Sequence, residues 1–553
     1  MRDSRFRGRL LALLGAVALV TAACGGAEEA GTASSGGDST AAPSSSDDAA
    51  GESEELVLTV AINGDVETFD PCCANFINSH YGLLMVYEVP VIHPTVSLNG
   101  AQIGDPDDLE GLYFESWDVA DDGVTYNVKV RPGLTMHDGT PINAETVRYM
   151  IERNLDTPGG GNWLLRNIAF VTQPPTVLGE YELEVVADQP SPMTMQSFYM
   201  SSSAAIDSSV VDANATDEDT WATEFFQRNV VNGSGPYKLV SRVPDQELVF
   251  EAFDDYWRGR PAYDRVVFKI VPSAAERVQL LRSGAVDVAL GLGTAEFAAL
   301  EGADGVNIVQ SPSANMVYIG LGNEVEPLSN KTLRQAISYA VDYEDILTNV
   351  YQGDARRLRG PINSSSPFSI GDEIGYDRDL DRARELLAEA GYDGETLTLS
   401  IDSSRSEHEL IAVRFQSALR EAGINVEIEQ LTPAVFAERK VGENRMAMFI
   451  DEGLPWIDDP NYTLSIFLEG GVFGNYAQYS SARVDEIIAE GWVELDPARR
   501  VELFAEAQRI IVDDAPWVFL AQPNYKIAMR DTVGGYVHYP NEIARIAQFE
   551  PAS

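Results

Sequence analysis

The sequence predicts an α/β protein built from more than one domain. Segments with the two-residue alternation of strands are followed along the chain by segments with the helical spacing of apolar residues. Strands that alternate with helices are typical of α/β folds, in which helices cover a sheet. With 44% hydrophobic residues, the roughly 500 residues after a polar N-terminal segment can bury more than one core, so two or three domains are expected.

The first 23 residues have the layout of a secretion signal. Arginines are concentrated at the very start, an apolar run over 10–20 is too short to span a bilayer, and small residues lead to Cys24. Cys24 stands where a bacterial lipobox places the cysteine that receives lipid, although Thr21 occupies a position at which that motif prefers Leu. We therefore expect residues 1–23 to be removed and Cys24 to be lipidated.

Residues 25–55 contain only Gly, Ala, Ser, Thr, Asp, Glu and Pro. No side chain there can contribute to a core, and the acidic residues have no basic partner, so the segment is expected to be a disordered, self-repelling tether. The signal, the lipidated cysteine and the tether together would hold a globular protein close to the outer face of a membrane.

The composition offers no catalytic or metal-binding pattern. The five histidines are scattered without metal-ligand spacing, and no Gly-x-Ser-x-Gly elbow occurs. Carboxylates are so abundant that a pair at glycosidase distance carries no information before the fold places it. A formal net charge of −47 argues against nucleic-acid binding, which needs the opposite sign. We expect no catalytic residue, metal or cofactor, with a secreted hydrolase as the rival class.

The most informative stretch runs from Tyr126 to Met150. Alternating apolar residues up to Val130 predict a strand buried on one face, and Pro132-Gly133 ends it. Asp138-Gly139 makes a second tight turn. Asn143 can then cap a helix. Taken alone, these features predict an ordinary strand–turn–helix unit.

In this order the stretch resembles the signature of the peptide/nickel-type (family 5) extracellular solute-binding proteins of ABC importers. Val130-Arg131, Gly133, Asp138-Gly139-Thr140-Pro141 and the helix start at Ala144 occupy the places of that signature, with Met136 where an aromatic residue is usual. Further matching segments extend the resemblance over about 56–540. They include the Gly-x-Gly-Pro-Tyr turn at 233–237, the helix 334–340, the helix 381–390 that stops at Gly391, and the late strand 516–520.

The resemblance implies a two-lobed, periplasmic-binding-protein-like α/β clamp (class II) with an extra α/β domain inserted into the first lobe. The expected divisions are 1–23 signal peptide, 24–55 lipidated Cys24 and tether, 56–92 first part of lobe 1, 93–215 inserted small domain, 216–318 second part of lobe 1, 319–512 lobe 2 and 513–553 return to lobe 1.

The resemblance also implies a function. We expect a monomeric, non-enzymatic receptor that binds a small solute between its lobes and delivers it to an ABC permease and its ATPase. Lipid-anchored localisation on the extracytoplasmic face of the cell membrane would follow from Cys24.

Cys72 and Cys73 are adjacent and follow the first predicted strand. An even pair outside the cytoplasm suggests a disulfide, but neighbouring cysteines can close only a strained eight-membered ring. Two buried thiols are the alternative. We predict the disulfide, placed near the mouth of the ligand cleft and contacting the ligand.

The loop 449–462 bears on the class of ligand. In peptide-binding members, an Asp three residues before the acid of an Asp-Pro step captures the ammonium group of the peptide. Here Asp459-Pro460 supplies the step, and Trp456 stands at the capturing position. An indole suits a sugar ring or another flat ligand, and it can equally be core packing. Asp451 or Asp458 could supply a carboxylate for a cationic ligand.

Asn315, Asn475 and Tyr476 lie on segments that approach the cleft in this family. Neutral hydrogen-bonding groups around an aromatic plate favour a polyhydroxylated or otherwise neutral ligand such as an oligosaccharide. An oligopeptide is the alternative, and a cationic ligand also stays open.

Overall fold

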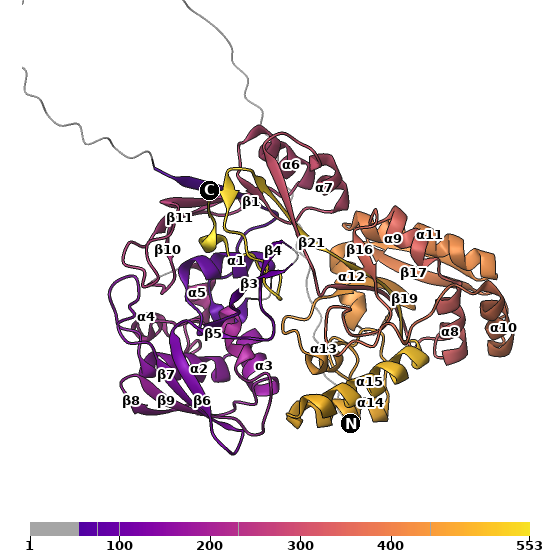
Figure 1. The fold of residues 1–553 in the computed structure, drawn as a ribbon, viewed down its shortest axis with the longest axis horizontal. Coiled ribbons are helices and arrows are strands. Elements are labelled where there is room, and N and C mark those ends of the chain that lie inside the picture. Colours follow the sequence, from indigo (N-terminus) through magenta and orange to yellow (C-terminus); the bar gives the residue numbers. More distant parts are fainter. Residues whose placement is uncertain (1–54, 75, 99, 230–231, 443) are drawn as a thin grey trace, which may run out of the picture. The chain divides into compact units, whose positions relative to one another are not determined.

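The computed structural model describes residues 55–553 apart from 75, 99, 230–231 and 443 (Figure 1). The predicted signal peptide, Cys24 and all of the tether but its last residue lie outside the described residues. In the part that is described, no helix combines the length and the apolar character needed to cross a membrane.

The first large sheet has seven strands, drawn from widely separated stretches of the chain. β1 pairs in parallel with β12, and β21 pairs antiparallel with both β13 and β14. In sheet order the strands are β10 (Tyr237–Val243), β11 (Glu247–Ala252), β12 (Arg265–Ile270), β1 (Val57–Ile62), β13 (Val288–Ala289), β21 (Tyr525–Arg530) and β14 (Val306–Ser311).

A four-stranded antiparallel sheet lies within the segment predicted to be the inserted domain. Its order is β6 (Phe114–Val119), β7 (Thr125–Val130), β9 (Glu182–Val186) and β8 (Thr176–Gly179). Tyr126, Val128 and Val130 are buried while Asn127 and Lys129 are exposed, so the alternation predicted for this strand is confirmed. This sheet and the first sheet contribute to one continuous cluster of buried residues, so the inserted segment shares its core with the first lobe.

The second large sheet has six strands and belongs to the second lobe. Its central strand, β15, is buried along its whole length. The order is β16 (Ala355–Arg357), β20 (Trp517–Pro523), β15 (Met316–Leu321), β19 (Met448–Gly453), β17 (Thr396–Asp402) and β18 (Asn425–Leu431). A separate core cluster surrounds this sheet.

The chain passes between the two large sheets twice. It leaves the first sheet after Ser311 and enters the second at Met316, and it returns between Pro523 and Tyr525. Both crossings therefore differ from the predicted lobe boundaries, 318/319 and 512/513. β20 pairs with β15 and β16, so the late strand that was predicted to begin the return belongs to the second lobe, and the return comes at residue 524.

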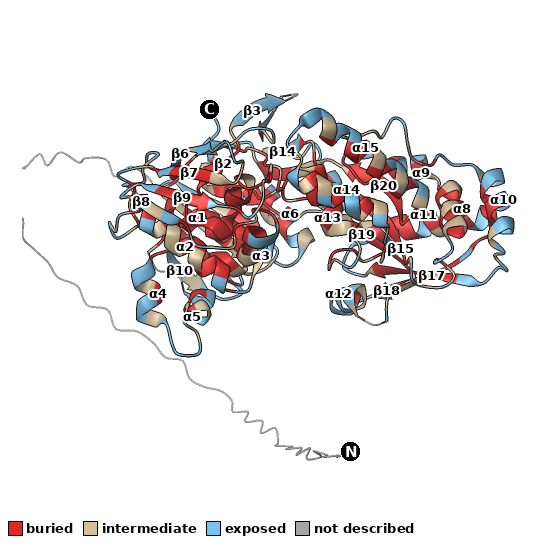
Figure 2. Cartoon of the chain, turned by 90° about the horizontal axis from the view of Figure 1, so that it is seen from below, coloured by how far each residue is buried: buried red, intermediate tan, exposed pale blue. Residues whose placement is uncertain are grey.

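Helices cover these sheets, and Figure 2 shows buried residues on inner elements such as α1 and β15, while outer helices such as α10 carry exposed residues. The first-lobe helices are α1 (Ile77–Val86), α2 (Ala144–Asp156), α3 (Gly160–Asn167), α4 (Ser208–Asn214), α5 (Thr223–Arg228), α6 (Ala274–Ser283) and α7 (Thr294–Leu300). The second-lobe helices are α8 (Lys331–Ala340), α9 (Tyr343–Asn349), α10 (Leu380–Ala390), α11 (Ser406–Ala422), α12 (Pro433–Val441), α13 (Pro460–Phe467), α14 (Ala482–Val493) and α15 (Pro497–Asp514).

Helix ends agree with the sequence signals. Asn143 caps α2 by accepting hydrogen bonds from the backbone N–H groups of Glu145 and Thr146, and the Thr146 hydroxyl accepts from the Asn143 N–H in return. α10 ends at Gly391, whose φ of 72° is the left-handed conformation that glycine adopts without strain.

Three short two-stranded pairings complete the fold: β2 (Val91–Ile92) with β5 (Glu110–Gly111), β3 (Thr95–Leu98) with β4 (Ala101–Gly104), and β22 (Val533–Gly534) with β23 (Glu550–Pro551).

The two glycines of the Gly-x-Gly-Pro-Tyr turn allow close backbone contact with the end of α1. A Cβ atom at Gly233 would lie 1.9 Å from the carbonyl oxygen of Val86, and one at Gly235 would lie 2.6 Å from the amide nitrogen of Tyr87. The Gly235 N–H donates to the Val86 carbonyl at 2.9 Å. The role of the two glycines is therefore to let this turn pack closely against α1 in the first lobe.

Candidate functional site

A cavity of about 270 Å³ lies where segments of both lobes meet. The Thr294 N–H at the start of α7 donates to the Glu407 carboxylate on α11 at 2.8 Å, which links the two lobes beside the cavity. Chain crossings form part of its wall. The polar lining side chains are Asn63, Asn78, Tyr81, Thr294, Ser313, Asn315, Tyr351, Asp354, Glu407, Glu452, Asn524, Tyr525, Lys526 and Glu542.

Glu452, on β19, is the anionic centre of the second-lobe side. Arg405 approaches its carboxylate at 2.8 Å, and His408 Nε2 lies 3.6 Å away. Burial alone would raise the pKa of Glu452, but the neighbouring imidazole of His408 and the charge of Arg405 lower it to about 2. Glu452 is therefore ionised at every physiological pH.

Glu542 faces the cavity from the C-terminal segment of the first lobe. Burial raises its pKa to about 7, opposed by a hydrogen bond from the Ser313 hydroxyl and reinforced by the charge of Glu452. The phenols of Tyr81 and Tyr525 stand close enough for the carboxylate to affect their pKa values. At neutral pH the carboxyl of Glu542 is thus poised between its protonated and ionised forms.

Carboxylates outnumber cations in this lining, where Asp354, Glu407, Glu452 and Glu542 stand against Lys526. Asn315 donates through Nδ2 to Glu452 at 3.3 Å, while its buried Oδ1 has no hydrogen-bond partner among the described residues. Lys526, the cation of this lining among the described residues, pairs with Asp354, and Arg405, which is outside the lining, pairs with Glu452. The cavity therefore presents acceptors and negative charge to whatever enters it.

Trp456 lies outside this lining and packs across to the first lobe. Its ring is 5.7 Å from that of His80 on α1, in an edge-on arrangement at 77°. Trp456 also packs against the core cluster of the first lobe. Its position is that of a contact between lobes.

Asp451 and Tyr476 both contact Lys440, which does not line the cavity. Lys440 Nζ lies 2.7 Å from Asp451 Oδ2 and 4.3 Å from the centre of the Tyr476 ring. Asn475 is buried and braces its own loop, donating to the carbonyls of Glu469 and Tyr479. None of these three predicted residues lines the cavity.

Asp458 accepts a hydrogen bond from Asn363 at 2.9 Å, also away from the cavity lining. Burial raises its pKa, and the charge of the adjacent Asp459 adds to the shift. Asp459 caps α13 and pairs with Arg500, so the Asp-Pro step is structural here. Among the residues predicted to contact ligand, only Asn315 lines the cavity.

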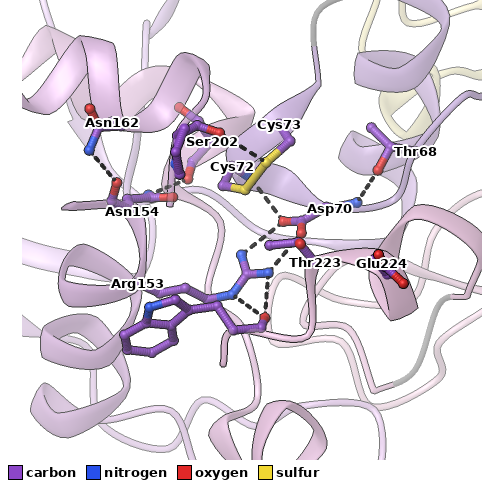
Figure 3. The surroundings of a disulfide bond; sticks show 12 residues. Thr68, Asp70, Cys72, Cys73, Arg153, Asn154, Asn162, Ser202, Thr223 and Glu224 are labelled. Carbon is purple, nitrogen blue, oxygen red and sulfur yellow. Dashed lines mark hydrogen bonds and ion pairs between the residues drawn. A yellow bond between two sulfur atoms is a disulfide. The ribbon is translucent and has the colours of Figure 1, made fainter. Parts of the chain in front are cut away.

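Cys72 and Cys73 are joined by a disulfide (Figure 3). Cys72 is buried, and the pair lies against the loop before α3, where a Cβ at Gly159 would come within 2.5 Å of the Cys72 carbonyl oxygen. The two sulfurs and Asp70 lie within metal-ligand spacing of one another, but bonded sulfurs offer no thiolate ligands. The disulfide also lies outside the lining of the interlobe cavity.

Asp70 anchors this turn through a buried ion pair. Its two carboxylate oxygens accept from Nη1 and Nη2 of Arg153 at 2.8 and 2.7 Å, and Oδ1 also accepts from the Cys72 N–H (Figure 3). Both charged side chains are almost fully buried. The disulfide turn of the first lobe is thereby fastened to α2.

The family model described as bacterial extracellular solute-binding proteins, family 5 Middle, matches residues 108–475. This chain belongs to that family. The resemblance in the sequence is confirmed, and residues outside the matched range contribute to both lobes.

Two relatives illustrate the range of the family. The probable D,D-dipeptide-binding periplasmic protein DdpA of Escherichia coli (strain K12) is 28% identical over 487 residues, covering 88% of this chain and 92% of that protein. Heme-binding protein A of Haemophilus influenzae is 29% identical over 463 residues, covering 78% and 82%.

Solved structures confirm the predicted fold class. The ABC transporter substrate-binding protein CtaP of Listeria monocytogenes superposes with a TM-score of 0.80 at 22% identity, covering 91% of this chain and all of that chain. The periplasmic binding protein DppA of Helicobacter pylori, in complex with the peptide STSA, gives 0.76 at 23% identity, covering 90% and 98%.

Glu452 and Glu542 were not predicted as site residues. They are 90 positions apart in the chain, and acidic residues are so common here that no local pattern distinguishes them. The family signature predicts the two lobes. Glu542 reaches the cavity because the C-terminal segment, after residue 524, returns to the first lobe.

Proposed function

We propose that this protein is an extracytoplasmic receptor that binds short peptides between its two lobes and delivers them to an ABC permease and its ATPase. The carrying observation is the charge of the interlobe cavity, in which, among the described residues, one lining cation, Lys526, stands against four carboxylates: Asp354, Glu407, Glu452 and Glu542. A protonated amine brings positive charge and N–H donors to these carboxylates.

The proposal places the peptide ammonium group between Glu452 and Glu542. This carboxylate pair takes over the task of the aspartate that Trp456 replaces in the loop before Asp459-Pro460. The cavity volume of about 270 Å³ is near the small end of ligand pockets and suits a short peptide.

The proposal corrects the preference for a neutral, sugar-like ligand that followed from Trp456. The indole packs against His80 and not into the cavity. Relatives are named for a dipeptide and for heme, and one solved neighbour holds a peptide, whereas none reported above is named for a saccharide.

Calorimetric measurement of the affinities of free and N-acetylated peptides tests the proposal. Short peptides with a free amino terminus should bind, and their N-acetylated forms should bind at least about tenfold more weakly, because a charged hydrogen bond contributes ~1.5–3 kcal/mol. Glu452→Gln should weaken binding similarly, while Glu427→Gln, an exposed glutamate on β18, serves as the matched control. Equal affinity for free and acetylated peptides would refute the amine site.

A thermal-shift screen separates the ligand classes. A cognate ligand at about one hundred times its dissociation constant should stabilise the fold by ~2.7 kcal/mol. Stabilisation by oligosaccharides and not by peptides would overturn the proposed cargo. Turnover of a bound peptide by the purified protein would instead support the rival hydrolase class.

Delivery requires a location outside the cytoplasm. We propose that cleavage before Cys24 and lipidation of its thiol anchor the protein to the membrane, with residues 25–55 as a tether. Mass spectrometry of the native N-terminus provides the test: a chain that begins beyond residue 24, or an unmodified Cys24, would contradict it.

A further inference from the structure

A second cavity, of about 530 Å³, lies within the first lobe and shares no lining residue with the interlobe cavity. Its wall is formed by the end of α1, the strands that follow it, the loop 256–261 and the C-terminal segment 535–550. No residue between 262 and 534 contributes, so the second lobe takes no part in this cavity.

Arg545 lines this cavity and is only 7% exposed. The central carbon of its guanidinium lies 5.0 Å from the ring centres of both Tyr199 and Tyr539. These aromatic faces compensate part of the cost of burying a positive charge.

The aromatic rings compensate the charge of Arg545 but do not supply acceptors for all of its N–H groups. Nε and Nη2 are buried and have no hydrogen-bond partner in the part of the chain that the structure describes. Within the same residues, no carboxylate forms an ion pair with this guanidinium. A buried cation without a counter-ion is unfavourable, which calls for an external anion.

Nε and Nη2 form one edge of the guanidinium, with two N–H bonds that run in parallel. This edge matches the paired oxygens of a carboxylate or a phosphate, and both hydrogen bonds are then charge-assisted. Neighbouring acids do not fill the position. Glu88 accepts from the Val89 N–H, the Tyr256 hydroxyl and Trp257 Nε1, and Glu110 and Glu550 are exposed.

We propose that Arg545 binds an oxyanion, a carboxylate or phosphate group, in this first-lobe cavity, separately from the cargo between the lobes. Arg258 lines the same cavity and adds a second positive charge. The cavity is large enough for the anion to be part of a small organic molecule.

The test is a calorimetric titration of the full chain with inorganic phosphate and, separately, with acetate, at constant ionic strength. Saturable one-to-one binding of either anion supports the site, and the pair of titrations tells which oxyanion it prefers. Arg545→Lys keeps the charge but loses the paired edge, so it should bind at least about tenfold more weakly. Arg382→Lys, at an exposed arginine on α10, is the control and should bind as the unaltered chain does.

Absence of saturable binding of both anions, or unchanged binding by Arg545→Lys, would overturn the proposal. Should Arg545→Lys fail to fold, a crystal structure of the unaltered chain grown with the tighter anion decides the question. An anion on Nε and Nη2 supports the site, and an empty guanidinium edge refutes it.

Discussion

Binding of an amine beside Glu542 should release a proton. Burial raises the pKa of Glu542 to about 7, so about nine-tenths of its carboxyls are protonated at about pH 6. An ammonium group next to it favours the ionised form. If the pKa returns to its ordinary value of 4.5 in the complex, binding releases about 0.9 proton per molecule at about pH 6. Above about pH 8 it releases almost none.

The sign of the pH dependence follows directly. Because binding releases a proton, affinity should rise with pH over the interval from 4.5 to about 7 and level off above it. Over about pH 5 to 7 the same two pKa values give a roughly 40-fold gain in affinity. The peptide amine stays charged in this range, since an α-amino group has a pKa of about 8.

The assay is calorimetry at about pH 6 in two buffers of different ionisation enthalpy, which counts released protons. Burial lowers the pKa values of His80, His137 and His538 to about 4, so these imidazoles stay neutral and contribute little to the count. Glu542→Gln should abolish the release while leaving the Ser313 hydroxyl a partner. Identical heats in both buffers, or undiminished proton release in Glu542→Gln, would refute the assignment of Glu542 to the amine.

Three further predictions concern the first lobe. Asp70→Asn should lower the free energy of unfolding by about 3–5 kcal/mol in denaturant titrations, because it leaves Arg153 buried without its counter-ion, whereas Asp377→Asn, in a mostly exposed pair, should cost about 1 kcal/mol or less. Gly235→Ala should destabilise by more than about 1 kcal/mol because its Cβ meets the backbone of α1, while Gly160→Ala, with its nearest neighbour 3.9 Å away, should not; equal stability of the two would contradict the close-packing account. The unfolded Cys24→Ser chain should show no reactive thiol before reduction and both Cys72 and Cys73 thiols after it; two thiols without reductant would exclude the disulfide.

Local sequence patterns predicted the elements well and the site poorly. The strand ending at Val130, the Asn143 cap and the helix ending at Gly391 depend on neighbours within one or two turns, so the sequence contains what determines them. The boundary at 513 failed for a different reason. A buried strand such as β20 has the same apolar pattern in either sheet, and only its pairing with β15 and β16 assigns it to the second lobe.

Trp456 shows the limit of transferring a single position from a family signature. The sequence identified the departure from aspartate, but both a ligand plate and a contact between lobes suit an indole. The two carboxylates that we propose take over the task of that aspartate lie on β19 and on the C-terminal segment. They come to the same cavity only once both chain crossings are in place.

The position of β21 has a consequence for how the protein is made. This strand lies inside the first sheet, between β13 and β14, yet it is the last long strand in the chain. During synthesis the first lobe is begun first, but its sheet is complete only when residues 525–530 have been made. Until then β13 and β14 each have an unpaired edge. The second lobe, in contrast, has all its strands once Pro523 has emerged. A chain that is cut short by about thirty residues would therefore lose the lobe that it started with and keep the one that it started later.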